Sequence, residues 1–152
     1  MGNCTTVSNL SDATMDNSPE FTLAGQQCKA KVIDVYDGDT LTLAFVFTGR
    51  IFQKKCRVYG IDCAEVRTRN KKEKTIGLDA KQFVSDLLLN KIIWVEFNQK
   101  DDKYGRLLGK IYPVKGGDTL ASMLIAKGYG YEYHGEKKQR FGDWYTKYWK
   151  GE

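Results

Sequence analysis

Acidic residues flank a glycine at one point of the chain, directly after an apolar, strand-like run. This stretch is Asp37-Gly38-Asp39-Thr40. Two interpretations of it stay open. Asp-Gly is a strong signal for a tight turn, in which Gly38 can adopt a positive φ angle. The two aspartates can also form half of a metal site, because carboxylate oxygens are the ligands that a hard cation such as Ca²⁺ prefers.

Two later segments add arginines and further acids. In CRVYGIDCAEV, Arg57 precedes Asp62 and Glu65, and the segment DDKYGR ends in Arg106. Taken singly, these residues are ordinary surface charges and loop acids. Guanidinium groups also donate paired hydrogen bonds to phosphate and stay charged at any relevant pH. Four cysteines without a CxxC pair, together with a single histidine, argue against a zinc site.

Length and composition fit one soluble globular domain. The chain has 152 residues, of which 41% are hydrophobic and 28% charged. The net charge of +5 serves solubility or a polyanionic partner such as nucleic acid, and its size does not decide between them. No apolar stretch is long enough to span a bilayer. The cysteines form no disulfide framework, so we expect free thiols in a reducing compartment.

The elements that must position these residues are strands and helices with clear hydrophobic periods. Alternating or β-branched segments predict strands at 28–36, 40–47, 51–61, 91–97 and 107–114. Helical spacing predicts helices over 77–89, 117–128 and 139–149. We expect Asp118 to cap the second helix, Gly128 to end it, and the basic segment 66–76 to be a loop. The fold class expected is mainly β with α, a five-stranded OB-fold barrel with three packed helices.

The first 27 residues differ from the rest and are predicted to be a flexible segment ahead of a domain at 28–150. They contain no Lys or Arg and no apolar block, which argues against a secretory signal and a mitochondrial presequence. The start MGNCTT fits N-myristoylation at Gly2, with Cys4 as the local candidate for the S-palmitoylation that stable anchoring requires. So short a pattern also arises by chance. The expected location is cytoplasmic, with a tether to the cytosolic face of a membrane if both lipids are attached.

Together, DGDT, the spacing of Arg57, Asp62 and Glu65, and DKYGR resemble the staphylococcal nuclease family, from about Lys29 to about Tyr133. The resemblance implies an OB-fold barrel with three helices and a Ca²⁺ cofactor. It further implies a phosphodiesterase that cleaves DNA and RNA with little sequence preference and leaves 3′-phosphate ends.

The resemblance also assigns roles to single residues. Asp39 and Asp62 match metal-binding aspartates, with Asp37 as an additional acid beside them, and Cys63 stands where the family offers a backbone carbonyl to the metal. Glu65 matches the glutamate that binds or activates the attacking water. Arg57 and Arg106 match the two phosphate-binding arginines. Further implied substrate contacts are Lys103, Tyr104 and either Tyr131 or Tyr133 as a base-stacking residue. Ala64 replaces a family proline, which loosens the loop that aims Glu65.

Three functions therefore compete at this stage. The first is a calcium-dependent nuclease, expected to be a monomer that prefers single-stranded DNA and RNA because unpaired bases can stack on aromatic rings. The second is a catalytically weak or inactive OB-fold module that binds nucleic acid. The third is a lipid-anchored interaction protein whose basic segment contacts anionic headgroups, which leaves the acidic set unexplained.

Overall fold

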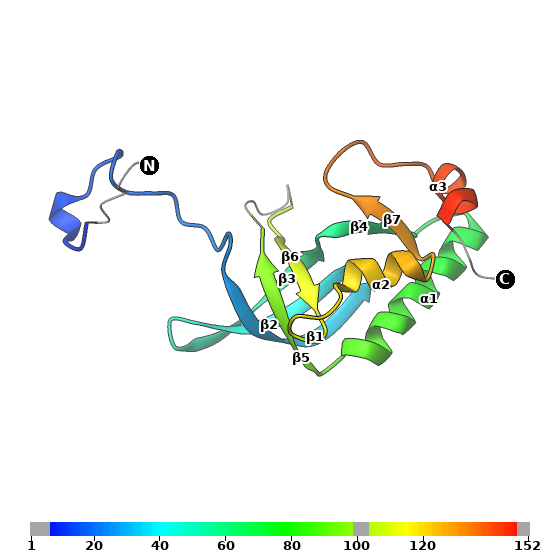
Figure 1. The fold of residues 1–152 in the computed structure, drawn as a ribbon, viewed down its shortest axis with the longest axis horizontal. Helices are drawn as coiled ribbons and strands as arrows, with labels where there is room; N and C mark the ends of the chain where they lie inside the picture. The colour runs from blue at the N-terminus through cyan, green and yellow to red at the C-terminus, as the bar shows by residue number, and fades with distance from the viewer. Residues whose placement is uncertain (1–6, 99–103, 149–152) are drawn as a thin grey trace.

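A computed structural model describes residues 7–98 and 104–148 of the chain. Its centre is a closed five-stranded barrel with the strand order β1-β2-β3-β6-β5 (Figure 1). The pair β3–β6 is parallel and the other four pairs are antiparallel. The strands are β1 (Gln27–Asp37), β2 (Thr40–Phe47), β3 (Arg50–Val58), β4 (Gly60–Cys63), β5 (Ile92–Phe97), β6 (Leu107–Tyr112) and β7 (Gly130–Tyr133). The predicted OB-fold barrel with three helices is confirmed.

The core lies inside the barrel and follows from the two-residue period of the strands. Leu41 and Leu43 of β2, Val95 of β5 and Ile111 of β6 are all buried. Residues that alternate with them along the strands, such as Thr42, Trp94 and Tyr112, are only partly buried, as the pleat of a strand requires. The barrel thereby provides a rigid base for the ends of β1 and β3, where the acidic and basic residues of interest lie.

The predicted strand 51–61 is in fact two strands. Gly60 adopts a φ of 93°, which breaks the run and turns β4 away from the barrel. β4 pairs instead with β7, which the sequence did not predict, in a separate antiparallel sheet. In that sheet Asp62 lies opposite Tyr131.

Three helices cover the barrel at the end that carries this small sheet (Figure 1). They are α1 (Lys71–Leu88), α2 (Leu120–Ala126) and α3 (Phe141–Tyr148). The prediction that 66–76 is a loop is wrong from Lys71 onwards, because the Asn70 side chain accepts hydrogen bonds from the Lys72 and Glu73 amides and starts α1 there. The N-cap of α2 is Thr119 and not Asp118.

The N-terminal segment leaves the barrel on one side (Figure 1). Its described part, residues 7–26, contains one short 3-10 helix, η1 (Leu10–Asp12). The amide of Gly25 donates to the carbonyl of Phe97, which fastens the end of the segment to β5. Gly2 and Cys4, the predicted lipidation sites, lie outside the described residues. No helix in the described parts of the chain is both long and apolar enough to cross a membrane.

Candidate catalytic site

The turn between β1 and β2 places Asp39 against the small β4–β7 sheet. Gly38 does not adopt the positive φ that a glycine turn allows. Glycine is needed at this position because a side chain would have no room. A Cβ at this position would lie 2.9 Å from Cys63 Sγ and 3.0 Å from Ala80 Cβ. The absence of a side chain at Gly38 therefore lets the turn reach Cys63, and brings Asp39 next to the segment that carries Asp62.

Replacing Gly38 by alanine should destabilise the protein by about 1–3 kcal/mol, the usual cost of forcing a methyl group into a packed contact. Urea unfolding measures this change. Gly142→Ala is the matched control, because a Cβ at Gly142 meets no atom within 4 Å and alanine favours a helix. Equal unfolding free energies for Gly38→Ala and the unmodified protein would contradict the close approach.

Arg57 joins the two buried aspartates. Its Nη1 lies 3.0 Å from Asp39 Oδ1, and its Nη2 lies 2.8 Å from Asp62 Oδ1. Nη2 also donates to the Ile61 carbonyl at 3.1 Å. The structure thus brings together Asp39, Asp62 and Arg57, three residues that the sequence assigned to one site from separate segments.

Asp62 has two further partners that sequence reasoning did not connect to it. The Tyr131 hydroxyl donates to Asp62 Oδ2 at 2.8 Å and accepts from the Gln139 amide at 2.9 Å. Lys138 Nζ lies 2.8 Å from Asp62 Oδ1 and 3.9 Å from Glu65 Oε1. Lys138 therefore places a positive charge between two of the predicted catalytic carboxylates.

Asp39 is held on its other sides by Thr40 and Cys63. The Cys63 amide donates to Asp39 Oδ2 at 2.9 Å, and the Thr40 hydroxyl donates to Asp39 Oδ1 at 3.2 Å. Arg106 Nη1 donates in turn to the Thr40 hydroxyl at 3.3 Å. Through buried Thr40, the second predicted phosphate-binding arginine is linked to the same acidic centre.

Two residues of the site, Thr40 and Lys138, were not predicted, and the sequence marks only the first of them. Thr40 directly follows Asp39 in the DGDT motif, so its place at the site could have been inferred from that motif. Lys138 is one of several basic residues in EKKQR, and no spacing rule connects it to Asp62. Only the folded backbone, which carries the segment after β7 across the site, shows this contact.

Burial and neighbouring carboxylates raise the pKa values of two acidic groups of the site, Asp39 and Glu65. Burial raises the pKa of Asp39 to about 7, and the carboxylates of Asp37 and Asp62 add to this rise against the lowering effect of Arg57. Burial also raises the pKa of Glu65, to which Asp39 and Asp62 contribute, while Lys138 opposes it. Burial alone would lower the pKa of Arg57, but Asp39 and Asp62 outweigh it and raise that pKa. An additional cation here would stabilise the ionised carboxylates.

This donor set fits calcium in its chemistry. The candidate ligands Asp39, Asp62 and Glu65 are carboxylates, whose hard oxygens are the donors that calcium prefers. Asp39, Asp62 and Glu65 do not form a complete cage, since within residues 7–98 and 104–148 no group of three or more His, Cys, Asp or Glu could hold a metal ion. A bound ion would therefore draw other ligands from backbone carbonyls, water or substrate.

A cleft of about 680 Å³ opens at Arg57, while Asp39 and Asp62 are not among the residues that line it. It is lined by Arg57, Arg106 and Lys138 and by the aromatic rings of Tyr104 and Tyr133. Arg106 lies under Tyr104, with its guanidinium carbon 5.4 Å from the ring centroid. A groove with cationic and aromatic walls suits a nucleic-acid strand, whose phosphates and bases need these two kinds of contact.

Not all of the predicted site residues reach this cleft. Glu65 lines a separate cavity of about 170 Å³ together with Asp37, and the Lys138 side chain lies between the cleft and Glu65. Tyr131 is only 1% exposed, so in this structure its ring offers no open face to a base. Lys103 lies outside the described residues.

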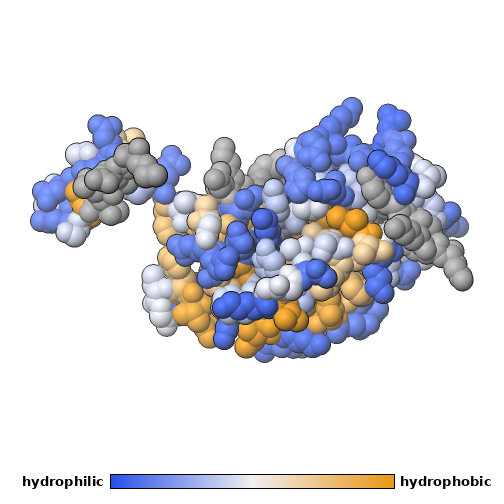
Figure 2. All heavy atoms as spheres, in the orientation of Figure 1, coloured by the Kyte–Doolittle hydropathy of each residue, from blue (hydrophilic) through white to orange (hydrophobic). Residues whose placement is uncertain are grey.

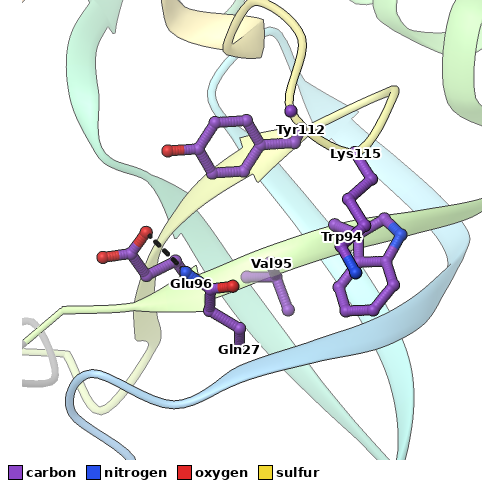
Figure 3. Close-up of a pocket in the computed structure, with 7 residues that line it drawn as sticks. Gln27, Trp94, Val95, Glu96, Tyr112 and Lys115 are labelled. Atoms are coloured by element: carbon purple, nitrogen blue, oxygen red, sulfur yellow. Dashed lines mark hydrogen bonds between the residues drawn. The ribbon is translucent and has the colours of Figure 1, made fainter.

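A further pocket of about 270 Å³ lies on the outside of the barrel, away from the acidic centre (Figure 3). Trp94, Tyr112 and Lys115 line it. At one edge, Nε2 of the Gln27 side chain donates to Glu96 Oε2 at 3.3 Å. Lys115 Nζ lies 4.2 Å from the centroid of the Trp94 ring. A face of the indole ring is therefore already covered by a lysine of this chain.

Comparison with known proteins agrees with this geometry. A model of the family described as Staphylococcal nuclease homologue matches residues 55–148, which is more than half of the chain. This range contains Arg57, Asp62, Glu65, Arg106 and Lys138, while the turn with Asp39 precedes it. A search of curated proteins finds no match.

Proposed function

Because the chain belongs to the staphylococcal nuclease homologue family, we propose that it is a calcium-dependent nuclease that hydrolyses phosphodiester bonds of DNA and RNA. The proposed products carry 3′-phosphate ends, and the proposed cleavage has little sequence specificity. The observation that supports this function most is the pairing of Arg57 with two buried aspartates, next to a cleft that also contains Arg106. Arginines alone suffice to bind phosphate, whereas two buried carboxylates beside them also supply oxygen ligands for a cation.

The arginines act on the phosphate. Arg57 lines the cleft from β3 and Arg106 lines it from just before β6. In the proposed mechanism the two guanidiniums contact different oxygens of one phosphate. Their charge is held in place before substrate arrives, by Asp39 and Asp62 for Arg57 and by Thr40 for Arg106. Preorganised charge of this kind stabilises the extra negative charge that develops on phosphate oxygens in the transition state.

Asp39 and Asp62 would hold the cofactor, with the Cys63 backbone carbonyl as a further ligand. Calcium bound there would polarise a phosphate oxygen and lower the pKa of the attacking water. Glu65 would accept a proton from that water or hold it in line for attack. Tyr131 would keep the Asp62 carboxylate in a fixed rotamer through its hydrogen bond to Oδ2, and Tyr133 would stack on a base in the cleft.

Replacing Glu65 by glutamine should lower turnover by about 100-fold or more and change calcium affinity by less than about threefold, because the amide keeps the shape but accepts no proton. Single-turnover cleavage and calorimetric calcium titration measure the two effects. Glu132→Gln is a suitable control, because Glu132 is exposed and does not line the cleft. Parallel losses of turnover and affinity would reassign Glu65 as a calcium ligand.

Replacing Lys138 by methionine should strengthen calcium binding by about tenfold. The ammonium of Lys138 competes with any cation for Asp62 Oδ1, and removing it raises the net negative charge of the site. Calcium displacement of bound terbium, followed by luminescence, measures the affinity without any nuclease assay. The neighbouring exposed Lys137→Met is the control, and an equal or weaker calcium affinity for Lys138→Met would refute this competition.

A second function, nucleic-acid binding without cleavage, is favoured by one observation. The described carboxylate oxygens of Asp39 and Asp62 already have partners in Arg57, Lys138, Tyr131, Thr40 and the Cys63 amide. A site satisfied in this way can fold and bind phosphates through its arginines with no metal. In that case the cleft would retain single strands intact.

One assay separates the two functions. The purified chain is incubated with a labelled single-stranded oligonucleotide in calcium or in chelator, and both cleavage and complex formation are followed on gels. Cleavage in calcium alone supports the nuclease, with 3′-phosphate ends identified by their response to phosphatase. A stable complex with an intact strand in both conditions supports the binding module.

We propose a monomer that acts in the cytoplasm on single-stranded DNA and RNA. Myristoylation at Gly2 and palmitoylation at Cys4 would tether it to the cytosolic face of a membrane, since one acyl chain alone gives only marginal binding. Intact-mass spectrometry of the chain expressed in eukaryotic cells tests the tether. A mass without acyl groups would refute it and leave the nuclease proposal unaffected.

A further inference from the structure

The hairpin of β2 and β3 extends past the barrel at its tip (Figure 1). Its turn is Thr48-Gly49, with φ angles of 50° and 75°. Val46 and Ile51 form a cross-strand pair beside this turn and are 66% and 76% exposed. Phe47 and Phe52 are 38% and 41% exposed. Four large apolar side chains therefore surround the free end of one hairpin.

These side chains occupy both faces of the hairpin. Cross-strand partners point to the same face, so Val46 and Ile51 share one face, while Phe47 and Phe52 lie in the pairs that face the other way. A sheet that covers a core on one side normally presents polar residues on the other. Packing on the barrel explains Phe45, which contacts Phe97, but it explains neither the Val46–Ile51 pair nor the exposed ring of Phe52.

The β2–β3 hairpin itself carries charges of one sign, whereas the N-terminal segment that meets it at Phe21 carries the acidic Glu20. The two strands and their turn, residues 40–57, contain no Asp or Glu. They contain Arg50, Lys54 and Lys55 in addition to Arg57 of the catalytic site. Figure 2 shows apolar side chains gathered at the hairpin end of the barrel. Exposed apolar side chains at a tip, with basic residues next to them, suit an anionic lipid interface. The headgroups attract the basic side chains, and the apolar side chains are buried at the boundary with the acyl chains.

The N-terminal segment meets the barrel at the same place. The Phe21 ring packs edge-on against Phe47, with centroids 5.8 Å apart, and Phe21 is itself exposed. The segment that leads to Gly2 and Cys4 thus departs beside the hairpin tip. A surface docked at this tip would lie on the side of the barrel from which residues 7–26 extend (Figure 1).

We propose that the β2–β3 hairpin tip is a membrane-docking element for an anionic lipid surface. Val46 and Ile51 enter the boundary between headgroups and acyl chains, and Arg50, Lys54 and Lys55 contact the anionic headgroups. The most exposed side chains are aliphatic and offer no ring on which a base could stack, which favours a lipid surface over a nucleic-acid strand. This docking requires neither nuclease activity nor an acylated N-terminus.

Co-sedimentation with vesicles tests the docking. The full chain is made in bacteria, so that it carries no acyl groups, and is mixed in chelator with vesicles of phosphatidylcholine alone or with 30% phosphatidylserine. We expect binding to the anionic vesicles, and at least about a tenfold weaker partition for the double variant Val46→Ser/Ile51→Ser. A second variant, Arg50→Gln/Lys54→Gln, should bind less and lose most of its salt dependence.

The control is Ile92→Ser/Val114→Ser, which removes a similar apolar area that is 67% and 68% exposed elsewhere on the barrel. It should bind vesicles as the unmodified chain does, and all variants should keep their melting temperatures. Failure of the unmodified chain to bind anionic vesicles, or equal binding by Val46→Ser/Ile51→Ser, would overturn the proposal. Two further results would also overturn it, since the tip would then serve another partner. One is a dimer of the unmodified chain, seen by light scattering, that Val46→Ser/Ile51→Ser abolishes. The other is a loss of oligonucleotide affinity that occurs only in Val46→Ser/Ile51→Ser.

Discussion

Replacing Arg57 by lysine should lower the turnover of a single-stranded substrate by at least about 30-fold, which corresponds to about 2 kcal/mol of transition-state stabilisation. Arg57 uses separate nitrogens for Asp39 and Asp62 at 3.0 and 2.8 Å, and its planar fork fixes both carboxylates and the phosphate contact together. A lysine ammonium is a single charge centre and cannot bridge the two carboxylates while facing a phosphate.

The same change should lower the free energy of unfolding by at least about 1.5 kcal/mol, because hydrogen bonds between charged groups are lost at buried positions. Single-turnover cleavage and urea unfolding measure the two effects on the same sample. The exposed Arg69→Lys serves as the control. Turnover near that of the unmodified protein in Arg57→Lys would contradict the role of the guanidinium in clamping the phosphate.

Replacing Asp62 by asparagine should weaken calcium binding by at least about tenfold and lower turnover by at least about 100-fold. Asp62 is the most connected carboxylate of the site, since its two oxygens meet Arg57, Lys138 and Tyr131. An amide of the same shape has no negative charge to offer a cation. Its NH2 group would also face Arg57 or the Tyr131 hydroxyl, which are both hydrogen-bond donors to Asp62.

Calcium titration followed by heat release measures the affinity, and cleavage at saturating calcium measures turnover. Asp86→Asn on the exposed face of α1 is the matched control, because Asp86 lies away from the site and accepts a hydrogen bond from the Gln82 side chain at 2.7 Å. Unchanged calcium affinity in Asp62→Asn would show that the ion binds elsewhere. Lost affinity with normal turnover at saturating calcium would confine Asp62 to ion binding.

The strands of the barrel could be predicted from the sequence because their residues alternate in burial. The segment 40–47 was predicted and found with the same bounds as β2, since Leu41 and Leu43 point into the core in the two-residue period. The break at Gly60 and the short strand β7 escaped prediction. Both depend on a pairing between segments about 70 residues apart, which no local pattern reveals.

The start of α1 was missed for a different reason. Lys71 to Thr75 are charged or polar and show no apolar period, so they matched a loop. Lysine and glutamate nevertheless favour helices, and Asn70 supplies the cap that begins one. Helix propensity and the Asn70 cap are therefore sufficient to form the first turn of α1, although this turn lacks an apolar face.

The candidate site was predictable where single motifs supply its residues and obscure where the fold brings separate segments together. Asp39, Arg57 and Asp62 were assigned to one site through the resemblance to the staphylococcal nuclease family, and they lie within one set of ion pairs. The place of Lys138 beside Asp62 follows from the path of the chain after β7. Either Tyr131 or Tyr133 was expected to stack on a base. Tyr131 is buried and packs against Trp144, with 5.5 Å between the ring centroids.

The most direct test of a calcium-dependent nuclease at this site is the cleavage rate of a fluorescent single-stranded oligonucleotide as a function of free calcium, with the unmodified chain and Asp39→Asn side by side. The proposed function predicts a saturable rise in rate for the unmodified chain, no cleavage in chelator, and little or no calcium response for Asp39→Asn. An oligonucleotide that stays intact at every calcium concentration, or equal calcium responses for the two proteins, would contradict it.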